Sequence, residues 1–445
     1  MGDSDRTEGL GTREGLAIGI TLFSMFFGAG NLILPPLLGV QAQSQTPLAM
    51  LGFLVAGIGL PVLGIVSVAR AGDLSRLAGR VHPAFGAVFA ALIYLAIGPC
   101  LAIPRTSSTS FEMLVPLLPA GVDPNVARVG FSLAFFAVAL ALAMRPGRLS
   151  RFMGRVSGPA LVALIVVLVG SALLRGLGEV GPATAPYDGN ATLGGFLTGY
   201  QTMDLLASLT FGLVIAENVR DLGVTSEAGV TREIGRAGLL MGVLMALVYC
   251  GLAYVGVAVA PGHPGLTNGA AALVASAGET LGVAGTVLVA AIFLVACLNV
   301  CCGLVSCCAT YFSEAVPRVG YRAWAVGFAA FSCAVSTLGL DAIIAFSGPL
   351  LGVLYPPAIV LVLMGLARRT FDGCPLCWPL GVGTATLLSL ASALATTLAP
   401  GTWTPLDLLP LSAQGLGWVL PTALALLAGA AAEPLRRRAV ARQAA

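Results

Sequence analysis

Residues 23–39 read FSMFFGAGNLILPPLLG, a strongly apolar stretch that contains two glycines, one asparagine and a pair of prolines. Pro35 and Pro36 lack N–H groups and crowd the carbonyls four residues earlier, so the carbonyls of Asn31 and Leu32 lose their helical partners. In hydrocarbon, such carbonyls persist only where they line a cavity, a water path or a bound ion or solute. A simple proline kink packed against neighbouring helices is the alternative. Because the glycines allow unwinding beside a polar asparagine, the stretch predicts a broken membrane helix that binds a ligand.

The composition of the whole chain is that of an integral membrane protein. Of its 445 residues, 57% are hydrophobic and 10% are charged, and the mean hydropathy is +0.94. A soluble globule of this composition could not present a polar surface. Long uncharged runs without two-residue alternation predict an all-α protein. We expect about twelve spans of about 20 residues, at 15–40, 47–69, 84–104, 127–144, 157–174, 193–216, 237–259, 281–311, 324–338, 343–366, 376–398 and 416–432.

The basic residues indicate the orientation of the chain in the membrane. All 23 are arginine. If the N-terminus is cytoplasmic, only three of them, Arg105, Arg128 and Arg175, fall outside the predicted cytoplasmic segments. This bias predicts an even number of spans, with a cytoplasmic tail at 1–14 and a basic cytoplasmic tail at 433–445. The lipid bilayer is therefore the expected partner, and arginines dispersed among loops without aromatic interleaving give no sign of nucleic acid.

Two polar residues inside the predicted spans are candidates for function. Asp204 lies in the sixth span, and an ionisable residue at membrane depth is a functional candidate. Alternatively, it lies near the outer mouth and caps a helix or pairs with an arginine. Asn299 in the eighth span either forms hydrogen bonds between helices or is an oxygen ligand for a hard cation such as sodium. Outside the spans, Cys374 and Cys377 form a CPLC motif that could bind metal or respond to redox conditions.

Breaks in the first and sixth spans suggest two repeats of five spans each. Carriers built as inverted repeats bind their substrate where two discontinuous helices face each other near the midplane. The repeats would cover 15–174 and 193–366, followed by two additional helices at 376–432. The internal match is thin, since little beyond Phe27-Gly28 against Phe211-Gly212 is shared.

Five motifs carry a resemblance to a known family, and they run along nearly the whole chain. They are FFGAGNLILPPLLG, IGPCLAIPRTSSTSFE, GYQTMDLLASLTFG, ACLNVCCGL and LLGVLYPPAIVL. In this respect the chain resembles the bacterial branched-chain amino acid:cation symporters. The resemblance implies a bacterial inner-membrane carrier with the five-plus-five inverted-repeat fold, which imports leucine, isoleucine and valine with sodium and needs no organic cofactor.

The resemblance also implies which residues hold the substrate. The GAGN segment, Gly28 to Asn31, matches an unwound segment that binds the amino-acid carboxylate on backbone N–H groups, here those of Ala29 and Gly30. SLTFG resembles a second unwound segment, in which Ser208 would cover the polar end of the substrate and Phe211 its side chain. The further candidates for the apolar pocket are Phe26, Met203 and Leu206.

The same resemblance places sodium against the carbonyls of Ser24 and Phe27 and two adjacent hydroxyl residues of the eighth span. This chain has Asn299-Val300 where the family has a hydroxyl pair, so Asn299 can supply one oxygen and Val300 none. A weakened sodium site, a shifted one, or proton coupling through Asp204 all remain open.

The mechanism implied is alternating access, in which a bundle containing spans one and six rocks against the rest. Arg105, with Glu112 two turns on, is a candidate for the outer gate, or an interfacial arginine at the end of the third span. The competing classes have less support. A channel requires a continuous polar pore. An enzyme requires several catalytic residues at one site, whereas the two histidines of this chain lie outside the spans. A carrier-like sensor without net transport stays an alternative, and the oligomeric state is not indicated.

Overall fold

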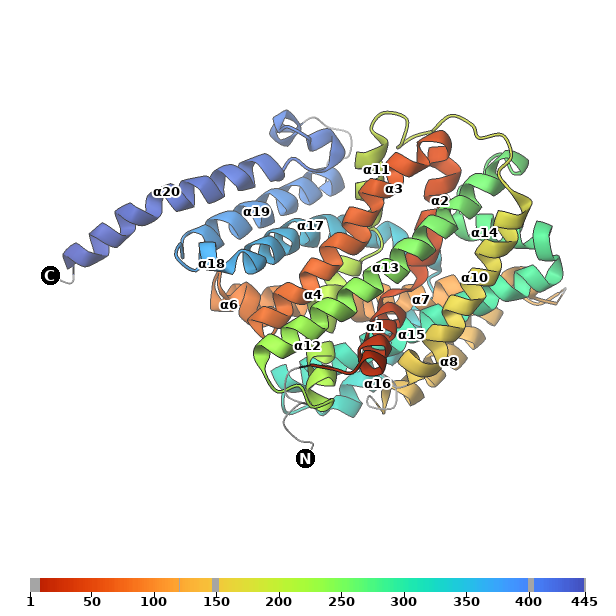
Figure 1. Cartoon of the computed structure of the whole chain (residues 1–445), viewed down its shortest axis with the longest axis horizontal. Helices are drawn as coiled ribbons and strands as arrows, with labels where there is room; N and C mark the ends of the chain where they lie inside the picture. The colour runs from red at the N-terminus through yellow and green to blue at the C-terminus, as the bar shows by residue number, and fades with distance from the viewer. Residues whose placement is uncertain (1–8, 120, 146–151, 399–403, 444–445) are drawn as a thin grey trace.

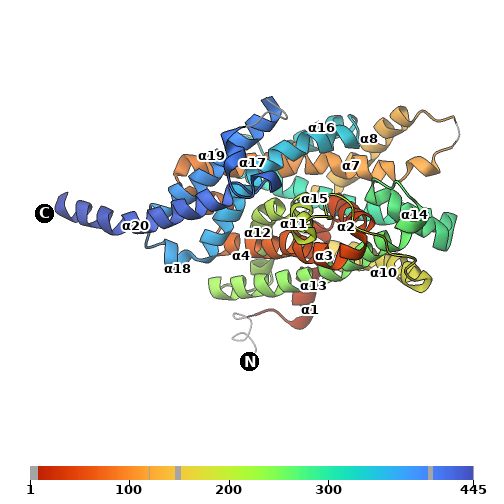
Figure 2. The ribbon, with the colours of Figure 1, turned by 90° about the horizontal axis from the view of Figure 1, so that it is seen from above.

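The structure is a computed structural model that describes residues 9–119, 121–145, 152–398 and 404–443. Within these ranges the chain is helical and has no strand. Figures 1 and 2 show the helices packed side by side, with the last helix, α20 (Val419–Gln443), extending past the rest of the molecule. The prediction of an all-α membrane protein with a five-plus-five arrangement is confirmed.

The first repeat contains five spans, of which only the fourth is one regular helix. Short π-helical turns interrupt spans two and three and open span five. In chain order the pieces are α1 (Thr12–Phe26), α2 (Ala29–Ala42), α3 (Thr46–Leu54), a π turn (Val55–Gly59), α4 (Leu60–Ala71), α5 (Leu74–Gly79), α6 (Pro83–Leu95), a π turn (Ala96–Cys100), α7 (Ala102–Glu112), α8 (Pro124–Ala143), a π turn (Met153–Ser157) and α10 (Gly158–Arg175).

The second repeat and the two additional helices follow. Span six is divided like span one, whereas spans seven, eight and ten are long single helices. The helices are α11 (Ala191–Tyr200), α12 (Asp204–Asp221), α13 (Glu227–Val259), α14 (Gly269–Leu281), α15 (Val283–Ala315), α16 (Tyr321–Ser336), α17 (Leu340–Leu366), α18 (Arg368–Phe371), α19 (Cys377–Leu398) and α20. Short 3-10 turns lie at Gln43–Gln45, Val115–Leu117, Ala260–Gly262, Pro405–Leu408 and Ser412–Gln414.

Eight helical segments of the described chain are long and apolar enough to cross a membrane. The other four predicted spans are not separate long helices. The second half of span one is continuous with span two, and span six is broken into two helices. Spans nine and twelve correspond to α16 and the apolar part of α20, which are short. Large apolar side chains are exposed on the outer helices, among them Val126 on α8, Leu174 on α10 and Leu398 on α19. These faces suit contact with lipid.

Small residues bring the two broken spans close to their neighbours. A Cβ atom built on Gly39 of α2 would lie 2.0 Å from the carbonyl oxygen of Ala253 in α13, and one on Gly256 would lie 2.0 Å from that of Pro36. Gly195 of α11 packs equally tightly against Ala49 of α3. Such contacts between helix backbones replace the hydrophobic driving force that is weak inside a membrane. They hold α2 and α11 in fixed positions at the centre of the molecule.

One expectation about local structure is corrected. Helix α2 continues through Pro35 and Pro36, so the break in span one lies earlier, at Phe27-Gly28. The prolines are the seventh and eighth residues of α2, and packing of α2 against α13 and α14 stabilises the helix around them. Residues 433–443 of the predicted basic tail continue α20, which runs without interruption from Val419 to Gln443. Residues 1–8 and 444–445 of the predicted tails lie outside the described ranges.

Candidate functional site

The first wall of the site is the break between α1 and α2. The N–H of Phe27 still bonds to the carbonyl of Phe23 at 2.8 Å, but the N–H of Gly28 turns to the side-chain oxygen of Asn31 at 3.4 Å. The carbonyl of Ser24 therefore loses its helical donor. On the other side of the break, the N–H groups of Ala29 and the residues after it begin a helix and have no preceding turn to bond to. The start of α2 is thus rich in hydrogen-bond donors.

The second break lies between α11 and α12, at Gln201, Thr202 and Met203. Met203 has φ 69° and ψ 8°, a left-handed conformation that is uncommon for a residue with a side chain. Span six was expected to unwind at SLTFG, residues 208–212, and this is wrong, since these residues lie within α12. The break comes about two turns earlier, after α11 ends at Tyr200, and the left-handed Met203 is the N-cap from which α12 starts at Asp204.

The two breaks are joined by a buried hydrogen-bond network. The amide of Asn31 donates to Asp204 Oδ2 at 2.6 Å and also to the hydroxyl of Tyr249 on α13. The Tyr249 hydroxyl donates to the same carboxylate oxygen at 3.1 Å. Asp204 is only 2% exposed, so it lies in the interior of the helix bundle. Among the described residues it has no arginine within 4.0 Å, and it is the first residue of α12, where the helix dipole favours a negative charge.

A third break, in span three, forms the remaining wall. Gly98 has non-helical angles, φ −84° and ψ −122°, and Pro99 follows it, so α7 restarts at Ala102. Arg105 lies in the first turn of α7, where its guanidinium donates to the carbonyl of Gln201 at 3.4 Å and lies next to Gly30. This break was not expected from the sequence, although the Gly98-Pro99 pair is a signal of it.

The three breaks enclose a cavity of about 30 Å³. Seven of the nine predicted substrate residues line it: Phe26, Gly28, Ala29, Gly30, Asn31, Met203 and Phe211. The rings of Phe26 and Phe211 meet edge to face, 5.1 Å apart. Besides the candidates Arg105 and Asp204, the cavity is lined by residues that were not predicted for the site: Met25, Ile97, Ala102, Thr106, Thr202, Ala207, Val300 and Leu304.

Leu206 and Ser208 do not line this cavity. Both are buried, but Leu206 lies on another face of α12, and Ser208, beside the face that bears Asp204 and Phe211, is directed to α4. The Ser208 hydroxyl donates to the carbonyl of Leu205 at 2.6 Å and packs against Gly64 of α4. Ser208 therefore belongs to the contact between α12 and α4.

The predicted sodium residues gather beside the broken end of α1. The Ser24 hydroxyl donates to the carbonyls of Ile20, at 2.9 Å, and Met153, at 3.4 Å. One turn along, Ser157 donates to the side-chain oxygen of Asn299 at 2.9 Å. The nitrogen of the Asn299 amide is buried and has no hydrogen-bond partner in the described part of the chain. Oxygen and nitrogen of an amide are assigned from their bonds, so one polar atom of Asn299 stays unsatisfied in either orientation.

Arg105 and Glu112 do not form a pair. Glu112 lies at the far end of α7 and contacts Arg128 of α8, with 3.5 Å between Oε1 and Nη2. Arg128 also lies over the ring of Phe111. The two predicted gate residues therefore belong to different environments, and only Arg105 reaches the cavity.

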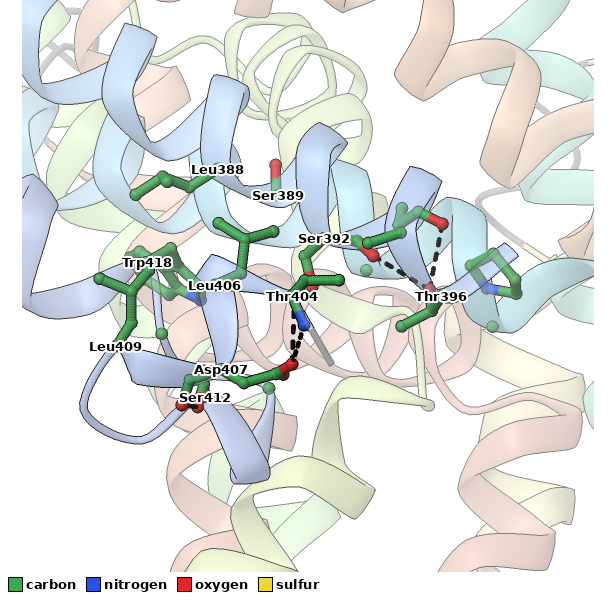
Figure 3. Close-up of a pocket in the computed structure, with 17 residues that line it drawn as sticks. Leu388, Ser389, Ser392, Thr396, Thr404, Leu406, Asp407, Leu409, Ser412 and Trp418 are labelled. Carbon is green, nitrogen blue, oxygen red and sulfur yellow. Dashed lines mark hydrogen bonds between the residues drawn. The ribbon is translucent and has the colours of Figure 1, made fainter. Parts of the chain in front are cut away.

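Two larger cavities lie beyond Arg105. The first, of about 450 Å³, shares Gly30 and Arg105 with the central cavity and includes Tyr355 and Trp418. The second, of about 760 Å³, lies between α17, α19 and residues 404–418, and Figure 3 shows its hydroxyl side chains with Asp407 bonded to Thr404. Trp418 and three glycines line both cavities, so they adjoin each other. Arg105 thus separates the small central cavity from a wide approach.

Comparison with known proteins identifies the family. The model of the family described as "Branched-chain amino acid transport protein" matches residues 11–435. The chain belongs to this family. It is 39% identical to the branched-chain amino acid transport system 2 carrier protein of Pseudomonas aeruginosa, over 93% of this chain and 94% of the relative. It is 36% identical to the branched-chain amino acid permease BraB of Bacillus subtilis, with the same coverage. The protein is therefore a multi-pass membrane transporter of branched-chain amino acids and not an enzyme.

The fold of this branched-chain amino acid transport protein is also found in distant solved structures. Mhp1, a nucleobase-cation-symport-1 family transporter in a closed conformation with bromovinylhydantoin bound, superposes with a TM-score of 0.61 at 15% identity. The match covers 96% of this chain and 94% of Mhp1. At this identity the likeness extends to the arrangement of the helices.

The CPLC motif of this transport protein lies away from the site. Cys374 and Cys377 are joined by a disulfide between α18 and α19. In the described ranges there is no group of three or more His, Cys, Asp and Glu side chains that could hold a metal ion. The metal-binding interpretation of CPLC therefore has no further ligands to support it.

Proposed function

We propose that this protein imports leucine, isoleucine and valine across the bacterial cytoplasmic membrane by cation symport, with sodium as the coupling ion. Both termini face the cytoplasm in this proposal. The single observation that supports it most is the cavity enclosed by three helix breaks, whose walls are tied together by Asn31, Asp204 and Tyr249. Unwound backbone at membrane depth is tolerated only around a cavity or ligand.

The walls of the cavity suit an aliphatic amino acid. Free N–H groups at the start of α2, from Ala29 and Gly30, are placed for a carboxylate because a helix N-terminus attracts anions. Phe26, Phe211 and Met203 supply apolar surface for the side chain. An apolar pocket separates side chains that differ by one methylene by only about 1–3 kcal/mol. We therefore propose a group of similar substrates.

Sodium coupling is supported by the oxygens beside the break. The carbonyls of Ser24 and Phe27 lie at the end of α1, and Asn299 reaches the same region through Ser157. If the Asn299 amide is turned so that its nitrogen faces Ser157, its oxygen becomes a buried acceptor that a hard cation would satisfy. A buried polar atom without a partner costs about 1–3 kcal/mol, so binding a cation there removes a penalty.

Proton coupling is the second candidate, and the surroundings of Asp204 favour it. Asp204 is a buried carboxyl group that accepts hydrogen bonds from Asn31 and Tyr249, and carboxyl groups at membrane depth carry protons in pumps and transporters. In this alternative, protonation of Asp204 takes the place of sodium.

Alternating access is supported by the cavities on the two sides of the site. The central cavity, about 30 Å³, holds about two water molecules and is too small for an amino acid unless its walls move. Beyond Arg105 lies the 450 Å³ cavity. On the arginine-rich side a cavity of about 1060 Å³ includes Asp73, Glu217 and Arg220. Movement of spans one and six relative to the other helices would open the site to each side in turn.

The test is uptake of radiolabelled leucine into proteoliposomes that contain this protein alone, with an imposed sodium gradient, a proton gradient or neither. Accumulation that requires sodium supports the proposal. Accumulation driven only by a proton gradient would show that protons are the coupling ion and favour protonation of Asp204 as the coupling step. Leucine exchange without accumulation under either gradient contradicts symport. Leucine binding without any movement favours a sensor.

A further inference from the structure

We propose that the substrate is recognised as a zwitterion by two charged side chains that line the cavity, Arg105 for the carboxylate and Asp204 for the ammonium group. This inference rests on the proposed function, and it names the contacts that would select α-amino acids as a class.

The first observation is that the cavity has one cation and one anion among its described lining residues. These are Arg105 and Asp204. Neither has an oppositely charged side chain within 4.0 Å in the described part of the chain, where the ion pairs lie elsewhere, as between Glu112 and Arg128. A charge at membrane depth is costly unless it meets an opposite charge or hydrogen-bond partners. A zwitterion between Arg105 and Asp204 supplies a counter-charge to both.

The second observation is the asymmetry between the two half-helices that face the cavity. Helix α12 begins with Asp204, which neutralises the positive end of its dipole. Helix α2 begins with Gly28, Ala29 and Gly30 and has no acidic residue in its first turn. Arg105, in the first turn of α7, adds a cation at Gly30 although the N-terminus of its own helix disfavours a positive charge. The start of α2 beside Arg105 therefore attracts anions, and Asp204 attracts cations.

The third observation is the spacing of the two contacts along α2. Arg105 lies beside Gly30, and Asp204 is bonded to Asn31, the next residue. In an α-amino acid the carboxylate and the ammonium group are attached to one carbon, so they can contact two side chains that lie beside consecutive residues. A β-amino acid separates the two groups by one more carbon and therefore tests how closely Arg105 and Asp204 match an α-amino acid.

Both side chains retain capacity for these bonds. The guanidinium of Arg105 has five N–H donors, of which the structure assigns one to the carbonyl of Gln201 at 3.4 Å. A carboxylate has about four acceptor sites, and Asn31 and Tyr249 both donate to Oδ2 of Asp204. An ammonium group can therefore bind Asp204 without breaking this network.

The experiment measures equilibrium binding to the purified full chain in nanodiscs, with no gradient. The probes are leucine, leucinamide, which lacks the carboxylate, 4-methylpentanoate, which lacks the ammonium group, and the β-amino acid β-homoleucine. Wild-type protein is expected to bind leucine at least about 10-fold more tightly than each analogue, the size expected for a lost charged hydrogen bond. Equal binding of leucine and leucinamide, or of leucine and 4-methylpentanoate, would overturn the proposal.

The variants assign each group to its partner. Arg105→Gln is expected to reduce the preference for leucine over leucinamide by about 10- to 100-fold, whereas Asp204→Asn reduces the preference for leucine over 4-methylpentanoate. Arg105→Lys keeps the charge and most of the preference, and it tests the site if Arg105→Gln does not fold. Arg128→Gln is the matched control, because this arginine pairs with Glu112 outside the cavity. Equal weakening of leucine and leucinamide in Arg105→Gln would show a structural role and contradict the carboxylate contact.

The failure of the inference differs from the failure of the proposed function. If wild-type protein binds no branched-chain amino acid or analogue, the proposed substrate is wrong, and the inference is wrong with it. If it binds leucine but does not distinguish it from leucinamide and 4-methylpentanoate, only the inference is wrong.

Discussion

Asn31, in the first turn of α2, donates a hydrogen bond of 2.6 Å to Asp204, the first residue of α12. The bond joins the two half-helices that the inverted repeat brings together, and Tyr249 of α13 completes it from a third helix. The oxygen of the same Asn31 amide accepts from the N–H of Gly28. One side chain therefore stabilises the break in span one and links it to the break in span six.

Replacement of Asn31 by alanine is expected to reduce leucine uptake strongly. The change removes the donor to Asp204 and the acceptor for Gly28, and loss of a buried hydrogen bond to a charged group costs about 1.5–3 kcal/mol. We expect a loss of about 10- to 100-fold in uptake efficiency at equal protein level. Asn125→Ala, at an exposed position on α8, is the control and should transport normally. Normal uptake by Asn31→Ala would contradict a role for this network.

Substitution of Val300 by threonine is expected to strengthen sodium coupling. Val300 lies against Gly28 beside the end of α1, and a hydroxyl there adds an oxygen ligand next to Asn299. The sodium concentration that gives half-maximal uptake should fall severalfold. The same change at Val295, on the same helix and away from the cavity, should leave it unchanged. An unaltered sodium dependence in Val300→Thr would argue against a sodium site at Asn299.

The two candidates on α12 should respond in opposite ways to replacement by alanine. Phe211→Ala removes an aromatic wall of the cavity, so valine should bind about 10-fold or more weakly, while larger side chains such as phenylalanine compete better. Ser208→Ala removes only a bond to the carbonyl of Leu205 at the contact with α4, so substrate affinity should stay unchanged. Competition against labelled leucine measures both. A selective loss of substrate affinity in Ser208→Ala would contradict this expectation and indicate that Ser208 contacts the substrate.

The glycine contacts predict a stability difference that does not depend on transport. Gly39→Ala places a Cβ atom against the backbone of Ala253, which cannot move aside, and overpacking of this kind costs about 1–3 kcal/mol. Gly170→Ala in α10 meets nothing within 4 Å and gains helix propensity of about 1 kcal/mol. Thermal unfolding in detergent should therefore show a lower midpoint for Gly39→Ala and an equal or higher one for Gly170→Ala. The reverse order would contradict tight packing of α2 on α13.

The sequence by itself determined the class of the protein and most of its fold. Long apolar runs without two-residue alternation, in a chain with 10% charged residues, indicate helices in a bilayer, because a helix satisfies its backbone hydrogen bonds within its own segment. The GAGN segment also marked the first break, since glycine lowers the cost of leaving the helix. These are local properties, and local sequence is enough to predict them.

Only the tertiary structure decided which residues meet at the site. The break in span six depends on the left-handed conformation of Met203. The break in span three lets Arg105 of α7 reach Gly30 of α2. Ser208 was expected at the substrate but faces Gly64, whereas Tyr249, which no motif marked, reaches Asp204. The direction in which a helical residue points depends on where its helix starts and on what packs beside it. That information comes from contacts between segments far apart in the chain, so the sequence of one segment does not contain it.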